Sequence, residues 1–87
     1  MEIPNGVKLF AEEHGGLFEL AVKGYKGEGN TLGYADGVRG RIPESTILVI
    51  EHSPEASTVD VLAFAEKLRN LNYRFAVIQA AGSGNNG

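Results

Sequence analysis

Hydrophobic and polar residues alternate along the first part of the chain, a pattern typical of strands with one buried face. Segments 7–12 and 17–23 carry it and flank Glu13-His14-Gly15-Gly16, a loop with two glycines that suits a hairpin. Pairing Glu12 with Leu17 brings three apolar pairs onto one face: Val7 with Val22, Leu9 with Leu20, and Ala11 with Phe18. Slipping by one residue would mix the faces, so the pattern predicts this register.

A second hairpin is expected around Asp36-Gly37, because this dipeptide favours a two-residue type I′ turn in which both residues have positive φ. Its strands would be Thr31–Ala35 and Val38–Ile42. Gly33 would then face Gly40, and Tyr34 would face Arg39 in a cation–π pair. Facing glycines leave a window in which a backbone, an aromatic ring or a ligand can approach closely. The three glycines within 24–30 predict a loop between the two hairpins.

The run of β-branched and apolar residues at 46–50 predicts a central strand that is buried on both faces. One long helix is expected from about Thr58 to Leu71, with Ser57 as its N-cap and Asn72 closing it in the left-handed conformation. Apolar residues recur along this helix at the spacing of one buried stripe: Val61, Phe64, Ala65, Leu68 and Leu71.

A last strand is expected at 73–80, which makes the element order β-β-β-β-β-α-β. The strand–helix–strand unit at 46–80 is long enough for a right-handed parallel crossover. The sequence therefore predicts an α+β fold: a small, mostly antiparallel sheet of two hairpins and a central strand, with one helix packed on one face. One helix cannot cover both faces, so the other face is open to solvent, a partner or a second copy. In the first hairpin Phe10 lies on the mixed face, opposite to the three apolar pairs, where it is either covered or exposed.

The chain has 87 residues, which leaves room for one domain, expected at 1–80, before a flexible Gly/Asn tail at 81–87. The apolar share of 43% is enough for one core and too high for a disordered chain. The chain has no apolar run near the ~20 residues of a membrane helix, no signal-peptide pattern at its start and no cysteine. These features favour a cytoplasmic protein.

Charge is distributed in bands, although the net charge is only −3. Segments 1–22 and 42–66 are acidic, whereas 23–41 and 67–87 are basic. Such bands either form patches that a partner recognises or reflect chance alternation between short elements. The mild overall acidity is unlike the basic composition of most dedicated nucleic-acid binders.

Groups suited to catalysis or metal binding are sparse. The two histidines, His14 and His52, are expected at a hairpin loop and at a strand end, and nothing in their spacing brings them together as metal ligands. An acid–base cluster at the strand end would consist of Glu51, His52, Ser53 and Ser57. A solvated turn accounts for the same residues, and no serine stands in a nucleophile elbow. We therefore expect no enzymatic activity, no cofactor and no metal.

The glycine-rich segment 23–41 is the predicted binding surface, since tyrosine and arginine are enriched at binding hot spots. Partner contacts are expected from Tyr25, Lys26, Tyr34, Arg39 and Arg41, beside the window of Gly33 and Gly40. We predict a small protein-binding module, an inhibitor or modulator of a larger host machine of the kind that mobile elements such as phages encode. A nucleotide or single-stranded nucleic-acid binder using the basic loop 23–41 is the alternative. A homodimer through the open sheet face or the last strand is a third reading.

Overall fold

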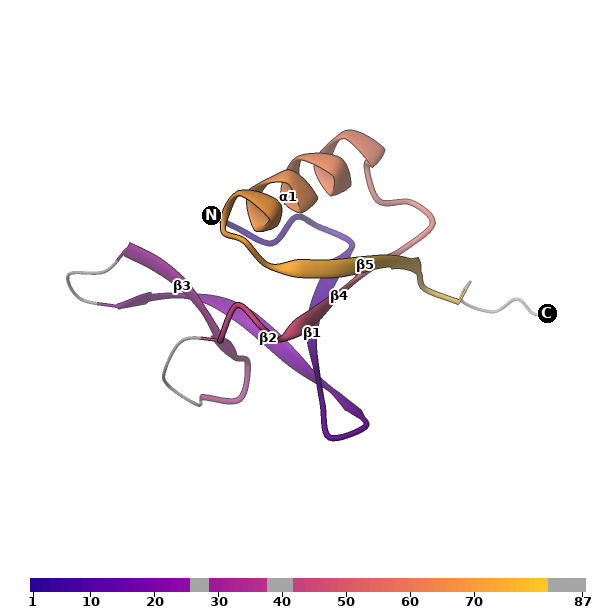
Figure 1. Cartoon of the computed structure of the whole chain (residues 1–87). Helices are drawn as coiled ribbons and strands as arrows, with labels where there is room; N and C mark the ends of the chain where they lie inside the picture. The colour runs from indigo at the N-terminus through magenta and orange to yellow at the C-terminus, as the bar shows by residue number, and fades with distance from the viewer. Residues whose placement is uncertain (26–28, 38–41, 82–87) are drawn as a thin grey trace.

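One mixed sheet and one helix make up the fold in the computed structural model (Figure 1), which describes residues 1–25, 29–37 and 42–81, with 24, 25, 29 and 30 described by their backbone alone. The elements within these ranges are β1 (Val7–Glu13), β2 (Gly16–Tyr25), β3 (Gly29–Tyr34), β4 (Ile47–His52), α1 (Thr58–Asn70) and β5 (Arg74–Gln79). The sheet order is β3-β2-β1-β4-β5, and only β4 and β5 are parallel among these neighbours. The predicted α+β class is confirmed.

The predicted register of the first hairpin is also confirmed. Leu9 lies opposite Leu20, and Glu12 lies opposite Leu17. The chain reverses through two residues with positive φ, His14 at 53° and Gly15 at 80°. The alternation of apolar residues was sufficient to set this register because one face of both strands is buried.

The second hairpin differs from the prediction. β3 starts at Gly29, inside the expected loop, and pairs with β2, so that Val22 lies opposite Leu32. Consecutive strands pair most often, and the ten-residue β2 offers a long edge to the segment that follows it. The expected partner strand lies outside the described residues at 38–41, while Ile42 is buried without being part of a strand.

The turn at Asp36-Gly37 is also not the expected type I′ turn. The N–H of Gly37 donates a hydrogen bond to the carbonyl of Tyr34 at 3.3 Å, so the chain does turn here. Gly37 has a φ of 102°, but Asp36 does not have positive φ. A type I′ turn requires positive φ at both positions.

Helix α1 has the predicted start and the predicted buried stripe. The hydroxyl of Ser57 accepts a hydrogen bond from the backbone N–H of Asp60 at 3.3 Å, and Asn72 follows the helix with a φ of 71°. The stripe is buried at four positions, Val61, Phe64, Ala65 and Leu68, whereas the fifth, Leu71, is exposed beyond the last turn. Within the described residues no helix is long and apolar enough to cross a membrane.

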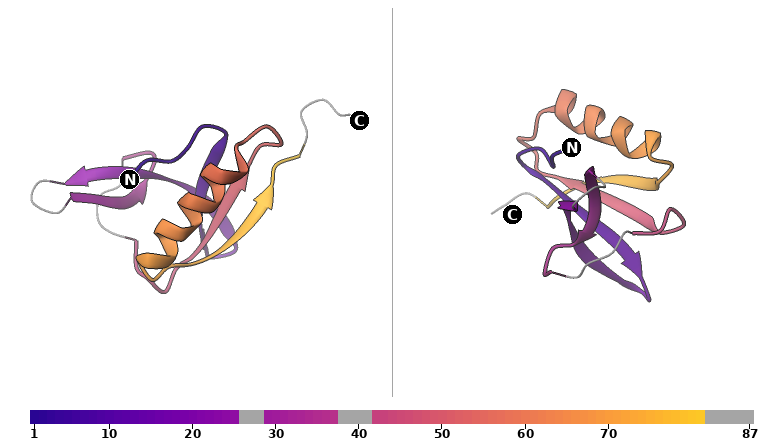
Figure 2. Two further views of the ribbon diagram at one scale, coloured as in Figure 1. Left: turned by 90° about the horizontal axis from the view of Figure 1, so that it is seen from above. Right: turned by 90° about the vertical axis from the view of Figure 1, so that its left-hand side faces the viewer.

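The core lies between α1 and one face of the sheet. The helix covers the β4–β5 side of that face, and β2 and β3 extend away from it (Figure 2). Fully buried side chains from four strands belong to one cluster with the buried stripe of the helix: Leu9, Leu20, Leu32, Leu48 and Ile50. Beyond Ala81, the predicted tail lies outside the described residues.

The prediction that β4 is buried on both faces is wrong. Leu48 and Ile50 point to the helix side and are fully buried. Ile47 points to the other side and is 43% exposed, and Val49 beside it is only half-buried. The reason is that no second layer from the described part of the chain covers this face of the interior strand.

Candidate protein-binding face

Most of the predicted hairpin surface cannot be placed. Lys26, Arg39, Gly40 and Arg41 lie outside the described residues, as does the side chain of Tyr25. Gly33 is described, and it lies buried in β3 opposite Ala21 of β2. The predicted window between Gly33 and Gly40 and the predicted pair of Tyr34 with Arg39 therefore stay predictions.

Tyr34 has partners of its own within the sheet. Its hydroxyl donates a hydrogen bond to the carboxylate of Glu13, and this bond raises the pKa of Tyr34 above the ordinary value of a tyrosine. Its ring packs edge-on against Phe18, with the ring centroids 6.4 Å apart. Tyr34 is thus half-buried and held by β1 and β2, on the face that also carries the core residues Leu9 and Leu20.

The uncovered face of the sheet is the larger feature. Side chains alternate along each strand, so every second residue of β2, β1, β4 and β5 points away from α1. We call this surface the open face. Its residues on these four strands are Leu17, Glu19 and Ala21 of β2; Lys8, Phe10 and Glu12 of β1; Ile47, Val49 and Glu51 of β4; and Arg74, Ala76 and Ile78 of β5.

Apolar side chains form the centre of the open face. Phe10 lies opposite Val49, and Val49 lies opposite Ala76, so that one apolar row crosses three strands. Ile47 and Ile78 flank this row and are 43% and 44% exposed. Single exposed apolar residues are common on protein surfaces, whereas a large contiguous apolar patch is typical of interaction sites.

Charged side chains surround this apolar centre. Lys8 lies opposite Glu51 at one end of the β1–β4 pair, and Glu12 occupies the other end. In the described part of the chain the only ion pair within 4.0 Å joins Arg69 to Glu66 on α1, so Lys8 and Glu51 make none with each other. An apolar centre with a charged, solvated rim is the usual anatomy of a protein interface.

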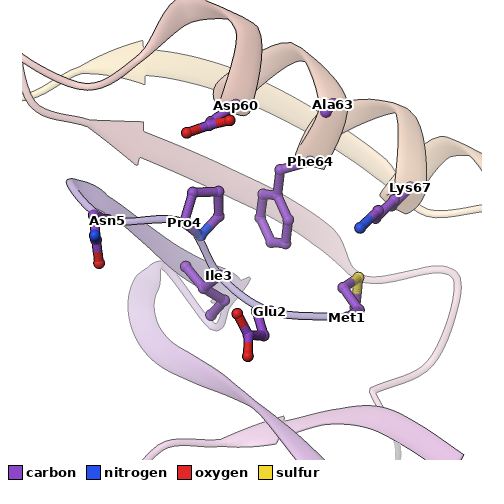
Figure 3. Close-up of a pocket in the computed structure, with 9 residues that line it drawn as sticks. All are labelled: Met1, Glu2, Ile3, Pro4, Asn5, Asp60, Ala63, Phe64 and Lys67. Atoms are coloured by element: carbon purple, nitrogen blue, oxygen red, sulfur yellow. The ribbon is translucent and has the colours of Figure 1, made fainter.

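A second feature is an open hollow of ≈ 580 Å³ between α1 and the N-terminal segment (Figure 3). The ring of Phe64 points toward Pro4 and Ile3, while Asp60 and Lys67 extend from the helix on either side. Met1 and Ile3 pack against the core, so the hollow is the seam along which this segment meets the helix. Neither a histidine nor a serine lines this hollow.

The residues considered for catalysis are not brought together. His52 lies opposite Val7 at the start of β1, and His14 follows the end of β1, so the strand separates the two histidines. Glu51 and His52 are consecutive in β4 and point to opposite faces. The Nδ1 atom of His52 lies 2.9 Å from the carbonyl oxygen of Ser53. The described residues contain no group of three His, Cys, Asp or Glu residues placed to hold a metal.

Comparisons with protein-family models, with curated proteins and with solved structures find no match for this chain.

Sequence reasoning predicted an uncovered face but not most of its members. The single helix implied that one face stays open, and the hairpin register placed Phe10 on the mixed face of the first hairpin. Ile47, Val49 and Ile78 were missed because an unbroken apolar run has no alternation to show which residues are covered.

Proposed function

We propose that this protein is a small cytoplasmic protein-binding module that binds its partner through the open face. The observation that carries the proposal is the apolar row of the half-buried Phe10 and Val49 and the exposed Ala76, flanked by the exposed Ile47 and Ile78. Removing apolar surface from water contributes roughly 25 cal/mol per Å². Phe10 at the centre would be the anchor, since interface energy concentrates in central, desolvated aromatic residues.

The placement of the open-face side chains on regular strands supports a binding role. The open-face side chains stand on four hydrogen-bonded strands rather than on loops. A preformed surface loses little conformational entropy on binding, so more of the contact energy appears as affinity. A module of this kind acts by occupying a surface of its partner. Inhibitors and modulators that mobile elements encode act in this way on a larger host machine.

Photo-crosslinking tests the proposal directly. A photoreactive benzoylphenylalanine replaces Phe10 in one variant and Val59 in the control, because Val59 is 74% exposed on α1. Both variants are irradiated in a lysate of the cells of origin, and adducts are identified by mass spectrometry. We expect a covalent protein adduct from position 10 and none from position 59.

Other adducts would contradict the proposal. Equal labelling from both positions, or no adduct from position 10, would remove the open face as the binding site. An adduct that disappears after nuclease treatment would favour the alternative, a nucleic-acid binder using the basic loop 23–41. Binding driven by phosphate contacts would also weaken steeply as salt rises, whereas an apolar interface would weaken much less.

A further inference from the structure

We infer that the open face binds a second copy of this chain, sheet against sheet, with Lys8 of each copy placed over Glu51 of the other. The inference rests on the proposed role of the open face in protein binding, and it names a second copy of the chain, rather than a host machine, as the protein bound there. Small proteins most often bury a spare surface by two-fold self-association, in which one patch must complement itself. The arrangement of charges on the open face satisfies this requirement.

The complementarity follows from the register of β1 and β4. Lys8 lies opposite Glu51, and two residues along, Phe10 lies opposite Val49. A two-fold axis running parallel to the strands, between β1 and β4, exchanges these two columns. Each Lys8 then faces Glu51 of the second copy, and the symmetry makes this contact twice. Two residues along the strands from this pair of ionic contacts, each Phe10 packs on Val49 of the second copy.

The outer strands agree with the same axis. It places Glu19 of β2 over Ala76 of the second copy and Leu17 over its Arg74, according to the rows that the registers define. Arg74 of the second copy then lies over the strand next to Glu12, displaced sideways from it by about one strand spacing, ~4.8 Å. No two like charges of these four strands face each other.

The other in-plane axis is unfavourable. A two-fold axis perpendicular to the strands, through the row of Phe10 and Val49, would place Glu19 over Glu19 of the second copy. It would also place Lys8 over Glu12 of the second copy, an opposite-charge contact, and Glu51 over the apolar Ile47. Like charges directly across an interface cost several kcal/mol. The axis parallel to the strands is favoured because it pairs Lys8 with Glu51 and avoids the contact of Glu19 with itself.

The size of the contact sets its strength. Sheets that pack face to face lie ~10 Å apart with strand directions within about 30°. Four strands at ~4.8 Å spacing, each contributing three open-face residues, give a footprint of roughly 400 Å² per copy, about half of the ~800 Å² per partner of a standard interface. We expect a dimer that dissociates on dilution, with a Kd in the range of about 1–100 µM.

Charge reversal at the two positions tests the arrangement. Lys8→Glu places two carboxylates over each other, and Glu51→Lys places two ammonium groups over each other, so each variant should lose association by more than ~100-fold. Mixing the two variants in equal amounts restores an opposite-charge contact at both positions. Sedimentation velocity on the full chain at several concentrations should show dimers of the unchanged protein, monomers of each variant, and dimers of the mixture.

Mixing also separates this inference from a purely structural effect. Lys8 and Glu51 are neighbours within one sheet, so a reversal can weaken the fold, but mixing cannot repair damage within a single chain. A mixture that stays monomeric would overturn the inference, as would an unchanged protein that is monomeric at about 1 mM, well above the expected Kd. If position 10 still crosslinked to a different protein, the proposed function would stand without the second copy.

Discussion

The hydroxyl of Tyr34 in β3 donates a hydrogen bond to the carboxylate of Glu13 in β1, reaching across β2. Phe18 of β2 lies beside this contact and packs against the ring of Tyr34 at an interplanar angle of 83°. Gly16, opposite Glu13 in the register, adds no side chain there. One phenol thus joins three strands at an end of the sheet where Phe18 remains exposed.

The bond between Tyr34 and Glu13 predicts a loss of stability at high pH. The carboxylate of Glu13 raises the pKa of Tyr34 in the folded chain, mainly through the hydrogen bond. The hydrogen bond contributes fully to stability below the pKa of an unfolded tyrosine, about 10. This contribution is lost as pH rises through the raised pKa of Tyr34 in the folded chain. Urea unfolding between pH 8 and about 11 should therefore show a steeper decline for the unchanged protein than for Tyr34→Phe. Parallel declines would mean that the bond does not form.

Leu68 should be essential to the stability of the domain. Its side chain is fully buried in the core, and Leu68→Ala leaves a cavity that costs about 2–5 kcal/mol in the free energy of unfolding. Leu62 lies on the same helix and is 64% exposed, which makes Leu62→Ala a matched control expected to change stability by less than about 0.5 kcal/mol. Denaturant unfolding measures both variants. Similar midpoints would show that α1 does not pack as described.

Gly6 should tolerate alanine less well than Gly15. Both have positive φ, 79° and 80°, so Ala at either position carries a strain of roughly 1–2 kcal/mol. A Cβ at Gly6 would lie 3.0 Å from Oγ of Ser53 and 3.2 Å from Cβ of Ala56, whereas a Cβ at Gly15 meets nothing within 4 Å. Melting temperatures of Gly6→Ala and Gly15→Ala should therefore differ, with the former lower. Equal values would mean that Ser53 and Ala56 move aside.

Phe10→Ala and Arg39→Ala distinguish the two proposed binding surfaces. If the open face binds a second copy, Phe10→Ala should weaken association between copies by about 30-fold or more, the loss expected for a hot-spot residue. Arg39→Ala should then have little effect. If the predicted hairpin surface of Tyr34 and Arg39 binds, the effects should be reversed. Sedimentation of each variant, with circular dichroism to confirm that it is folded, measures the difference.

The sequence by itself determined the first hairpin and the ends of the helix. The register of Leu9 with Leu20 follows from alternation, because a slip of one residue would expose the core face. The ends of α1 follow from Ser57 and Asn72, because capping depends on side chains within one turn of the helix end. These interactions join residues that are close in the chain, so their partners could be identified from spacing alone.

Tertiary structure decided the pairing of distant segments and the composition of the open face. The pairing of Phe10 with Val49 depends on the sheet order, which places β4 beside β1 although 33 residues separate the end of β1 from the start of β4. The contact of Tyr34 with Glu13 depends on β3 lying against β2. The exposure of Ile47 depends on the helix covering only one face. Burial of an apolar side chain is favourable wherever the residue stands in the sequence. Only the packing of the whole chain therefore determines which apolar residues are left uncovered.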